Sequence, residues 1–139
     1  LPHPHVEGAP LDFSFSGLKT AVLNLLNNAK QKGQPVSVPD LCASYRKAVV
    51  DCLAQNFFRV AEETGARTLA VAGGVSANRL LRRRFGELCQ QTGRRLYVPD
   101  LSLCGDNAAM IASQGCYEFL AGHTAGMDLN ACAQRSIEE

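Results

Sequence analysis

The chain lacks the features that would assign it to a membrane or to general nucleic-acid binding. No apolar run approaches the roughly 18 residues that a helix needs to cross a bilayer. The net charge is only +1 over 139 residues, which excludes a strong nonspecific attraction to nucleic acid. The composition, 46% hydrophobic and 19% charged, is that of a globular chain. We therefore expect a soluble cytoplasmic protein without membrane contact, in which RNA contacts come from a local patch or another part of the molecule.

Cysteine and histidine are present, but their spacings indicate neither a metal site nor a nucleophile. The six cysteines form no C-x-x-C pair and have no histidine at zinc-site spacing, so we expect free thiols in a reducing cytosol. The chain has neither His-x-x-His nor His-x-x-x-His, and no Ser, Cys or Thr has a sequence context that identifies a histidine as its catalytic base. Cys42, Cys52 and Cys116 are expected to pack as small apolar side chains on helical faces.

The N-terminal residues 1–11 are rich in proline, histidine and glycine and predict a loop. Because Leu1 is neither a translation start nor part of a signal peptide, we expect the chain to be an excised piece of a longer protein. His3 and His5 are expected to be solvated. His123 lies just beyond a predicted helix and is interpreted as a surface cap.

Hydrophobic periodicity predicts alternating helices and strands, that is, an α/β chain. A short extended segment is expected at 11–17, and Ser37 or Asp40 is expected to cap the second helix. The order strand, helix, strand, helix in the second half predicts a parallel sheet with right-handed crossovers. The predicted elements are helices from Leu18 to the break at Gly33 and from about Leu41 to Gly65, a strand at 68–72, a helix from about Ala77 to Thr92, a strand at 95–98 and a helix from Ala108 to about Leu120.

The junction at 73–78, with the sequence GGVSAN, follows the first predicted strand and precedes a helix. Glycine lets the backbone approach a ligand closely, and the N–H groups and positive dipole end of a helix suit a nucleotide or phosphate. Ligands bind beyond the carboxyl ends of the strands in such sheets. A plainer interpretation is that Gly73 and Gly74 form a tight turn and Ser76 caps the helix.

Asp106 and Asn107 open the last predicted helix. The block 104–107 follows a strand and precedes a helix, as 73–78 does, so we expect both blocks on one edge of the sheet. Asp106 either caps the helix, where its charge suits the dipole, or coordinates a metal ion. A catalytic metal site needs about three protein ligands, so the other ligands would come from elsewhere.

Two further groups have a functional and a plain interpretation. The turn around Gly17 carries Ser14, Ser16 and Lys19, which could present hydroxyls and a cation to a ligand. Otherwise Ser16 caps the helix and Lys19 is solvated. The run Arg82-Arg83-Arg84 is interpreted as a solvated face in preference to an RNA contact, because consecutive helical positions point in different directions.

Three blocks of the sequence read DFSFSGLKT at 12–20, AGGVSANR at 72–79 and CGDNAAMIA at 104–112. Together they resemble the C-terminal half of the tRNA threonylcarbamoyladenosine transferase family (TsaD), formerly called O-sialoglycoprotein endopeptidase or glycoprotease. The resemblance covers nearly the whole chain in the family's order. The Ser-Ala-Asn of the second block resembles bacterial or organellar members.

The resemblance implies an actin-like ATPase fold, shared with sugar kinases and Hsp70 chaperones, in which two ribonuclease-H-like lobes surround a nucleotide cleft. Residues 1–139 would then be a single domain that forms most of the second lobe, with several helices on a mainly parallel sheet. The family transfers the threonylcarbamoyl group from threonylcarbamoyl-AMP to the N6 amine of the tRNA adenosine beside the anticodon. We expect one lobe of this acyltransferase, inactive in isolation, which acts with paralogous and ATPase subunits of the bacterial transfer complex.

The resemblance also implies site roles at matching positions. Asp106 matches the family's aspartate ligand to one divalent metal ion, iron or zinc, and Asn78 matches its substrate-binding asparagine. Gly73 and Gly74 match the glycines that line the nucleotide pocket. The paired histidines of the metal site belong to the N-terminal half. At position 105 the family often has threonine where this chain has glycine, which loosens the turn before the aspartate.

Two other functions remain open from the residues. One is a nucleotide-binding lobe of another actin-like ATPase or kinase, which ATP hydrolysis without tRNA would favour. The other is a noncatalytic lobe that docks paralogous subunits. The older protease interpretation has the least support.

Overall fold

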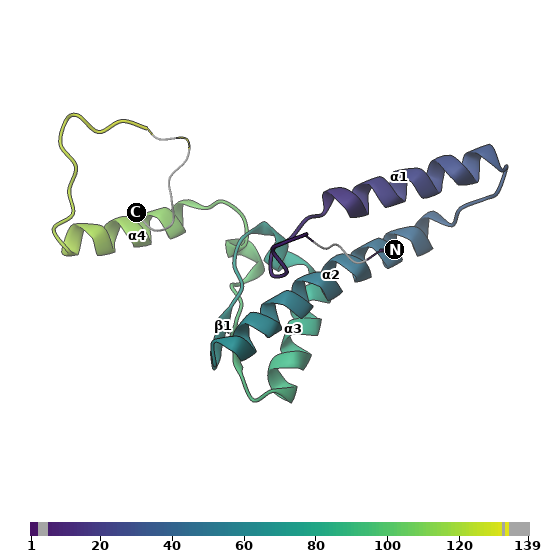
Figure 1. Ribbon diagram of the computed structural model, residues 1–139. Coiled ribbons are helices and arrows are strands. Elements are labelled where there is room, and N and C mark those ends of the chain that lie inside the picture. Colours follow the sequence, from purple (N-terminus) through teal and green to yellow (C-terminus); the bar gives the residue numbers. More distant parts are fainter. Residues whose placement is uncertain (3–5, 132, 134–139) are drawn as a thin grey trace. The chain divides into compact units, whose positions relative to one another are not determined.

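The chain divides into two compact units, Leu1–Cys104 and Gly105–Glu139, and each is described by itself. The computed structural model describes residues 1–2, 6–131 and 133, so the predictions for His3, His5 and Cys132 lie outside the described residues. The predicted α/β class is confirmed (Figure 1). The first unit contains α1 (Ser16–Gln31), α2 (Val38–Glu63), β1 (Thr68–Ala70), the 3-10 turn η1 (Gly74–Ala77), α3 (Arg79–Gln91), β2 (Arg95–Tyr97) and the 3-10 turn η2 (Leu101–Leu103), and the second contains α4 (Ala108–Leu120).

The helix boundaries agree with the prediction to within a few residues, and local signals explain them. Ser37 precedes α2, and its Oγ accepts a hydrogen bond from Asp40 N at 3.4 Å, which satisfies one free N–H group of the first turn. Gly65 follows α2 with a φ of 65°, a left-handed conformation that ends helices. The predicted cap at Ser16 is wrong, because α1 begins at Ser16 itself and no side chain caps it. The predicted extended segment at 11–17 is wrong at its C-terminal end, because Phe15 has helical backbone angles and residues 16 and 17 belong to α1.

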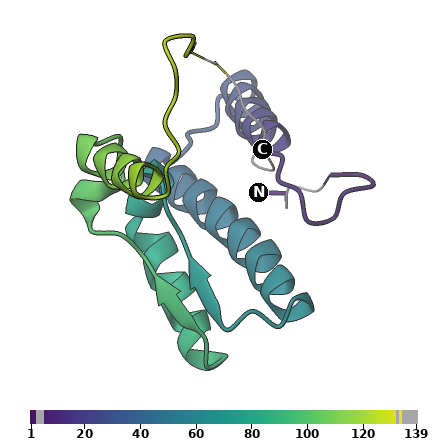
Figure 2. The same cartoon turned by 90° about the vertical axis from the view of Figure 1, so that its left-hand side faces the viewer.

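Strands β1 and β2 pair in parallel, as predicted (Figure 2). Leu69 pairs with Leu96, and both pack into the core that α2 and α3 share with β1. On the opposite face Thr68 and Ala70 are exposed. In the described part of the chain, β1 is therefore covered on one face only.

Side chains from α2, α3 and β1 form one hydrophobic core. The ring of Phe85 stacks on that of Phe57 with centroids 5.0 Å apart and meets Phe58 edge to face at 5.7 Å, both favourable aromatic geometries. This packing fixes β1 and α3, and with them the two ends of the segment 71–78 that joins them. The buried members of the core are Val50, Ala54, Phe58, Ala61, Leu69, Leu81, Phe85 and Cys89.

The five described cysteines are free, but only some of them are buried. Cys52 is buried as predicted, and burial raises the pKa of its thiol. Cys42 and Cys116 are exposed, so the prediction is wrong for both: Cys42 precedes the buried part of α2, and α4 buries no residue. Burial also raises the pKa of Cys89, against the opposing charge of Arg94. A neutral thiol is a poor nucleophile, so Cys52 and Cys89 act as core side chains.

The second unit consists of α4 and the segment that follows it. The bounds of α4 agree with the prediction. His123 Nδ1 lies 2.7 Å from Glu118 Oε2, and His123 N donates to Glu118 O at 2.9 Å, so His123 caps the end of α4 as interpreted. Hydrogen bonds hold the pKa of Glu118 below its ordinary value; the bond with His123 has the larger effect and the bond with Gln114 the smaller. In the residues that the structure covers, no helix has the length and apolar character needed to span a membrane.

We expect Phe85→Ala to lower the free energy of unfolding by about 3–5 kcal/mol, because it removes a fully packed ring from the core and leaves a cavity. Val75→Ala is the control, since Val75 is 64% exposed and a surface truncation changes stability by less than about 0.5 kcal/mol. Urea denaturation followed by circular dichroism measures both. Equal midpoints for the two variants would contradict the described core.

Candidate functional site

The loop 73–78 leaves the end of β1 and leads into α3. The last sheet contact is Val71 N to Tyr97 O at 3.0 Å, after which Gly73 adopts a φ of 80°. An added Cβ at Gly73 meets no atom within 4 Å, so glycine is required here by backbone conformation and not by space. Gly74 and Val75 are exposed. The loop therefore presents its backbone to solvent beyond the carboxyl end of a strand.

Ser76 is the one fully buried polar side chain of the described residues, with 0% exposure. Its Oγ donates a hydrogen bond to Cys104 Sγ at 3.2 Å. The plainer interpretation of Ser76 as a helix cap is therefore wrong, because its hydroxyl bonds to Cys104 and Asn78 is the residue that caps α3. Cys104, the first residue of the block 104–107, thus contacts the loop 73–78.

Asn78 caps α3. Its Oδ1 accepts hydrogen bonds from Leu80 N at 3.0 Å and Leu81 N at 3.3 Å, which satisfies two free N–H groups of the first turn. Capping fixes the orientation of the amide, because only the oxygen can accept from backbone N–H groups. In the described part of the chain Nδ2 makes no hydrogen bond. In this half-buried side chain Oδ1 therefore has a structural role, and Nδ2 is a donor available to a ligand.

Arg82 connects the loop to the segment after β2. Its Nε donates to Ser76 O at 2.6 Å, and its Nη2 donates to Pro99 O at 2.6 Å and to Cys104 Sγ at 3.1 Å. The interpretation of all three arginines as a solvated face is therefore wrong for Arg82. It holds for Arg83, which is largely exposed and lies 3.6 Å from Glu87. The sequence carried one unused signal: Arg82 is four residues after Asn78 and so shares its side of the helix.

Asp106 belongs to the second unit and is exposed. It does not cap α4, so that interpretation is wrong. Asn107 caps it, since its Oδ1 accepts from Met110 N at 2.8 Å while its Nδ2 donates to Gly105 O at 3.0 Å. The carboxylate is thus not engaged as a helix cap. Among the described residues no three His, Cys, Asp or Glu side chains lie close enough to hold a metal ion together.

The groups around Gly17 form no recognisable site. Ser16 is the first residue of α1, and Lys19 is exposed. The segment before them is held by Asn56 of α2, whose Nδ2 donates to Leu11 O at 3.1 Å and Asp12 O at 3.3 Å. The segment before α1 is therefore anchored to α2, whereas Lys19 is exposed to solvent.

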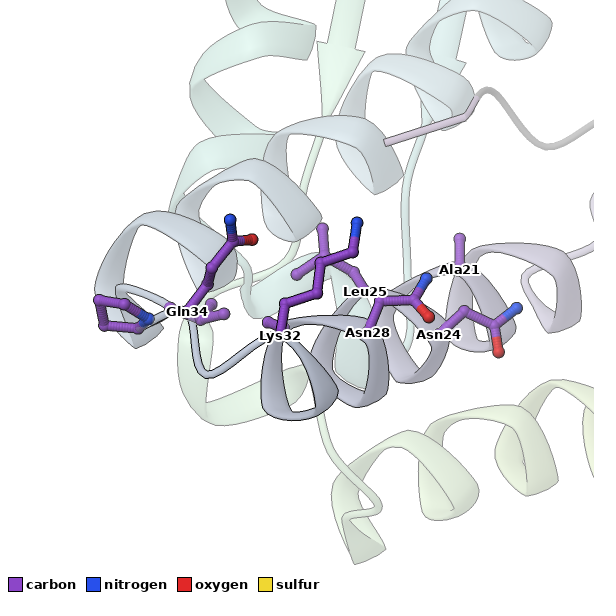
Figure 3. A pocket seen from close by; sticks show the side chains of 9 residues that line it. Ala21, Asn24, Leu25, Asn28, Lys32 and Gln34 are labelled. Carbon is purple, nitrogen blue, oxygen red and sulfur yellow. The ribbon is translucent and has the colours of Figure 1, made fainter.

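An open groove of about 510 Å³ lies along α1 and the segment that follows it (Figure 3). Its polar groups are the amides of Asn24, Asn28 and Gln34 and the ammonium of Lys32. It contains no carboxylate, histidine or thiol, and no residue of the loop 73–78 lines it. The groove therefore offers no chemistry beyond amide hydrogen bonding and one positive charge.

The family model described as "TsaD: tRNA N6-adenosine threonylcarbamoyltransferase" matches residues 1–113 of the chain. The matched range includes the loop 73–78, Arg82 and Asp106, and it ends within α4.

Curated relatives named tRNA N6-adenosine threonylcarbamoyltransferase resemble the chain over most of its length. The identity is 47% over 131 residues with the protein of Desulfitobacterium hafniense (strain Y51), covering 94% of this chain and 38% of the relative. It is 48% over 121 residues with that of Streptococcus equi subsp. equi (strain 4047), covering 87% and 35%. It is 38% over 139 residues with that of Clostridium botulinum (strain Kyoto / Type A2), covering 100% and 41%. The chain thus spans well under half the length of these relatives.

The cap at Asn78 predicts a difference between two substitutions. We expect Asn78→Ala to lower the free energy of unfolding by about 1 kcal/mol, because two N–H groups lose their acceptor. Asn78→Asp should leave stability within about 0.5 kcal/mol of the parent protein, because aspartate is an equally good N-cap. Chemical denaturation of the two variants measures the difference. If aspartate destabilises as much as alanine, Oδ1 is not the group that caps α3.

Proposed function

The chain belongs to the tRNA N6-adenosine threonylcarbamoyltransferase (TsaD) family, and from this premise we propose that it forms one lobe of an enzyme with that activity. The enzyme would transfer the threonylcarbamoyl group from threonylcarbamoyl-AMP to the N6 amine of the tRNA adenosine beside the anticodon. The observation that carries the proposal is the family match over residues 1–113. Because the chain spans 35–41% of the relatives' lengths, we attribute the activity to the whole protein and not to this piece.

The loop 73–78 is proposed to hold the adenylate. Gly73 and Gly74 let the backbone approach the nucleotide closely, which agrees with the exposure of Gly74 and the absence of any atom near a Cβ added to either glycine. Asn78 is proposed to bind substrate through Nδ2, the donor that remains when Oδ1 caps α3. The same side chain would then fix the start of the helix and recognise an oxygen of the ligand.

Asp106 is proposed as one ligand of a divalent metal ion, iron or zinc. An exposed carboxylate that does not cap α4 fits this role, and its oxygen atoms are suitable ligands for either ion. The other ligands would come from parts of the protein outside the described residues, which contain no group of three ligating side chains. When bound, the ion would orient the threonylcarbamoyl group and polarise its carbonyl.

The proposed reaction makes small demands on acid and base groups. The N6 amine of adenosine attacks the carbonyl carbon of the threonylcarbamoyl group, forming a C–N bond. The C–O bond to the phosphate of AMP breaks, AMP leaves with the electron pair, and the amine releases a proton to solvent. Because AMP is a good leaving group, positioning of donor and acceptor accounts for most of the required catalysis.

The proposal extends to partners and location. We propose tRNA as the acceptor, paralogous and ATPase subunits as partners, and the cytoplasm as the site of action. The five free cysteines of the described residues agree with a reducing compartment. With a net charge of +1, the chain offers little general attraction to RNA, so most tRNA contacts would come from the rest of the protein or from partners.

We expect the full-length protein that contains this chain to threonylcarbamoylate tRNA, and Asp106→Ala to reduce the rate at least ~100-fold, the scale seen when a catalytic electrostatic element is removed. Asp128→Ala is the matched control, since Asp128 is an exposed aspartate of the same unit. Transfer of labelled threonine to tRNA measures the activity, and elemental analysis of the purified protein measures bound metal. ATP hydrolysis without any transfer to tRNA would instead support a different actin-like ATPase.

Asn78→Asp separates recognition from capping. It keeps the acceptor for α3 but replaces the Nδ2 donor with a charged oxygen, so we expect kcat/KM for threonylcarbamoyl-AMP to fall by about 10- to 100-fold, the loss expected for one strong hydrogen bond, without loss of stability. Ser37→Asp, the same kind of change at the cap of α2, should leave kcat/KM unchanged. Full activity of Asn78→Asp would show that Nδ2 does not contact the substrate.

A further inference from the structure

A single guanidinium joins two segments that are distant in the sequence. Arg82 donates from Nε to the carbonyl of Ser76 at 2.6 Å and from Nη2 to the carbonyl of Pro99 at 2.6 Å. Nη2 also lies 3.1 Å from Cys104 Sγ. The first acceptor belongs to the loop 73–78, and the other two belong to the segment 99–104 that follows β2.

The acceptors of Arg82 are uncharged, which distinguishes it from its neighbour on α3. Arg83 is 72% exposed and pairs with Glu87, the kind of surface ion pair that contributes little. Arg82 is half-buried and makes no ion pair with a described residue; two carbonyl oxygens and a sulfur receive its hydrogen bonds. A planar guanidinium presents its donors in a fixed fork, so it can bridge two segments at once where an ammonium group cannot match the same directions.

A second contact reinforces the first. Ser76 Oγ donates to Cys104 Sγ at 3.2 Å, and Cys104 Sγ lies 3.4 Å from Asp100 O. The hydrogen bonds of the 3-10 turn, such as Ser76 N to Gly73 O at 2.9 Å, fix the shape of the loop. They do not fix its position relative to the segment after β2. Within the described residues, the side-chain hydrogen bonds between the loop and the segment after β2 are those of Arg82 and Ser76.

We propose that Arg82 is a positioning residue for the transfer reaction: it holds the loop 73–78 against the segment 99–104, so that the glycines and Asn78 stay in the arrangement that binds the adenylate. The proposal rests on the proposed function of the loop. It concerns Arg82 alone, which acts through the loop and needs no contact with the substrate. Lysine at this position keeps the charge but loses the fork, so charge alone cannot replace it.

The experiment compares Arg82→Lys and Arg82→Ala with the control Arg83→Lys in the full-length protein. We expect both Arg82 variants to lower kcat/KM for threonylcarbamoyl-AMP roughly 100-fold, the scale of a misplacement of about 1 Å, and to weaken AMP binding. The Arg83 variant should change kcat/KM by less than about threefold, as expected for a surface pair. Methylguanidinium, but not methylammonium, should restore part of the activity of Arg82→Ala.

Hydrogen exchange and thermal unfolding test how Arg82 acts. In Arg82→Lys we expect faster amide exchange within 73–78 and 99–104 and unchanged exchange in the core of α2 and α3. A uniform rise in exchange across the protein, with activity falling only as the protein unfolds, would overturn the proposal in favour of general stability. Activity of Arg82→Lys within threefold of the parent would also overturn it.

The outcomes separate this inference from the proposed function. If the parent protein transfers no threonylcarbamoyl group to tRNA, the proposed function fails. AMP affinity and the exchange of 73–78 in the Arg82 variants then still decide whether Arg82 positions a nucleotide-binding loop. If the parent is active and Arg82→Lys keeps its activity, AMP affinity and local exchange, the proposed function stands and the role of Arg82 is refuted.

Discussion

The arrangement around the loop 73–78 depends on the burial of one serine hydroxyl. A buried polar group must find a partner or destabilise the fold by the full cost of its lost hydration. Ser76 finds Cys104 Sγ, and its carbonyl finds Arg82. These contacts close a polar network between the end of one strand and the segment after the next. The hydrophobic core places β1 and α3, and this network then determines where the short loop between them lies. A loop held in this way can be exposed and still have a defined shape.

Side-chain hydrogen bonds also fix the starts of two helices, each of which is preceded by an asparagine. Asn78 and Asn107 each use Oδ1 to cap a helix, although Ser76 stands near the first and Asp106 stands next to the second. At Asn107 the remaining amide donor returns to Gly105 O, so both halves of the side chain are used locally. At Asn78 no described group receives Nδ2. The two caps are therefore chemically alike but leave different groups available. At Asn78 the Nδ2 donor lies beside the glycine loop, whereas at Asn107 the neighbouring carboxylate of Asp106 takes no part in capping.

Periodicity and turn chemistry predicted the elements well, because both act over a few residues. The stripe of α2, the Ser37 cap and Gly65 follow from local pattern. The parallel pairing of the two short strands follows from the order of the elements along the chain. The alternative interpretations of Ser76 and Asp106 as helix caps are wrong, because Asn78 and Asn107 cap α3 and α4. A cap depends on where the first turn begins, and each junction offers two competent side chains within three residues. The sequence indicates only that Arg82 shares a side of α3 with Asn78; its contacts with Pro99 and Cys104 could not be predicted, because only the folded sheet brings that segment near.

The errors at Cys42 and Cys116 have a different cause. An apolar stripe predicts burial against some partner, but it does not say whether that partner is in the same chain. In α2 the stripe is buried only from Val50 onward, where α3 and β1 supply the other side of the core. α4 is apolar along most of its length, yet it buries no residue. Likewise, no described residue covers the face of β1 that carries Thr68 and Ala70, which are exposed. The chain spans 35–41% of its relatives' lengths, whereas the hydrogen-bond network of Ser76, Arg82 and Cys104 lies entirely within the first unit.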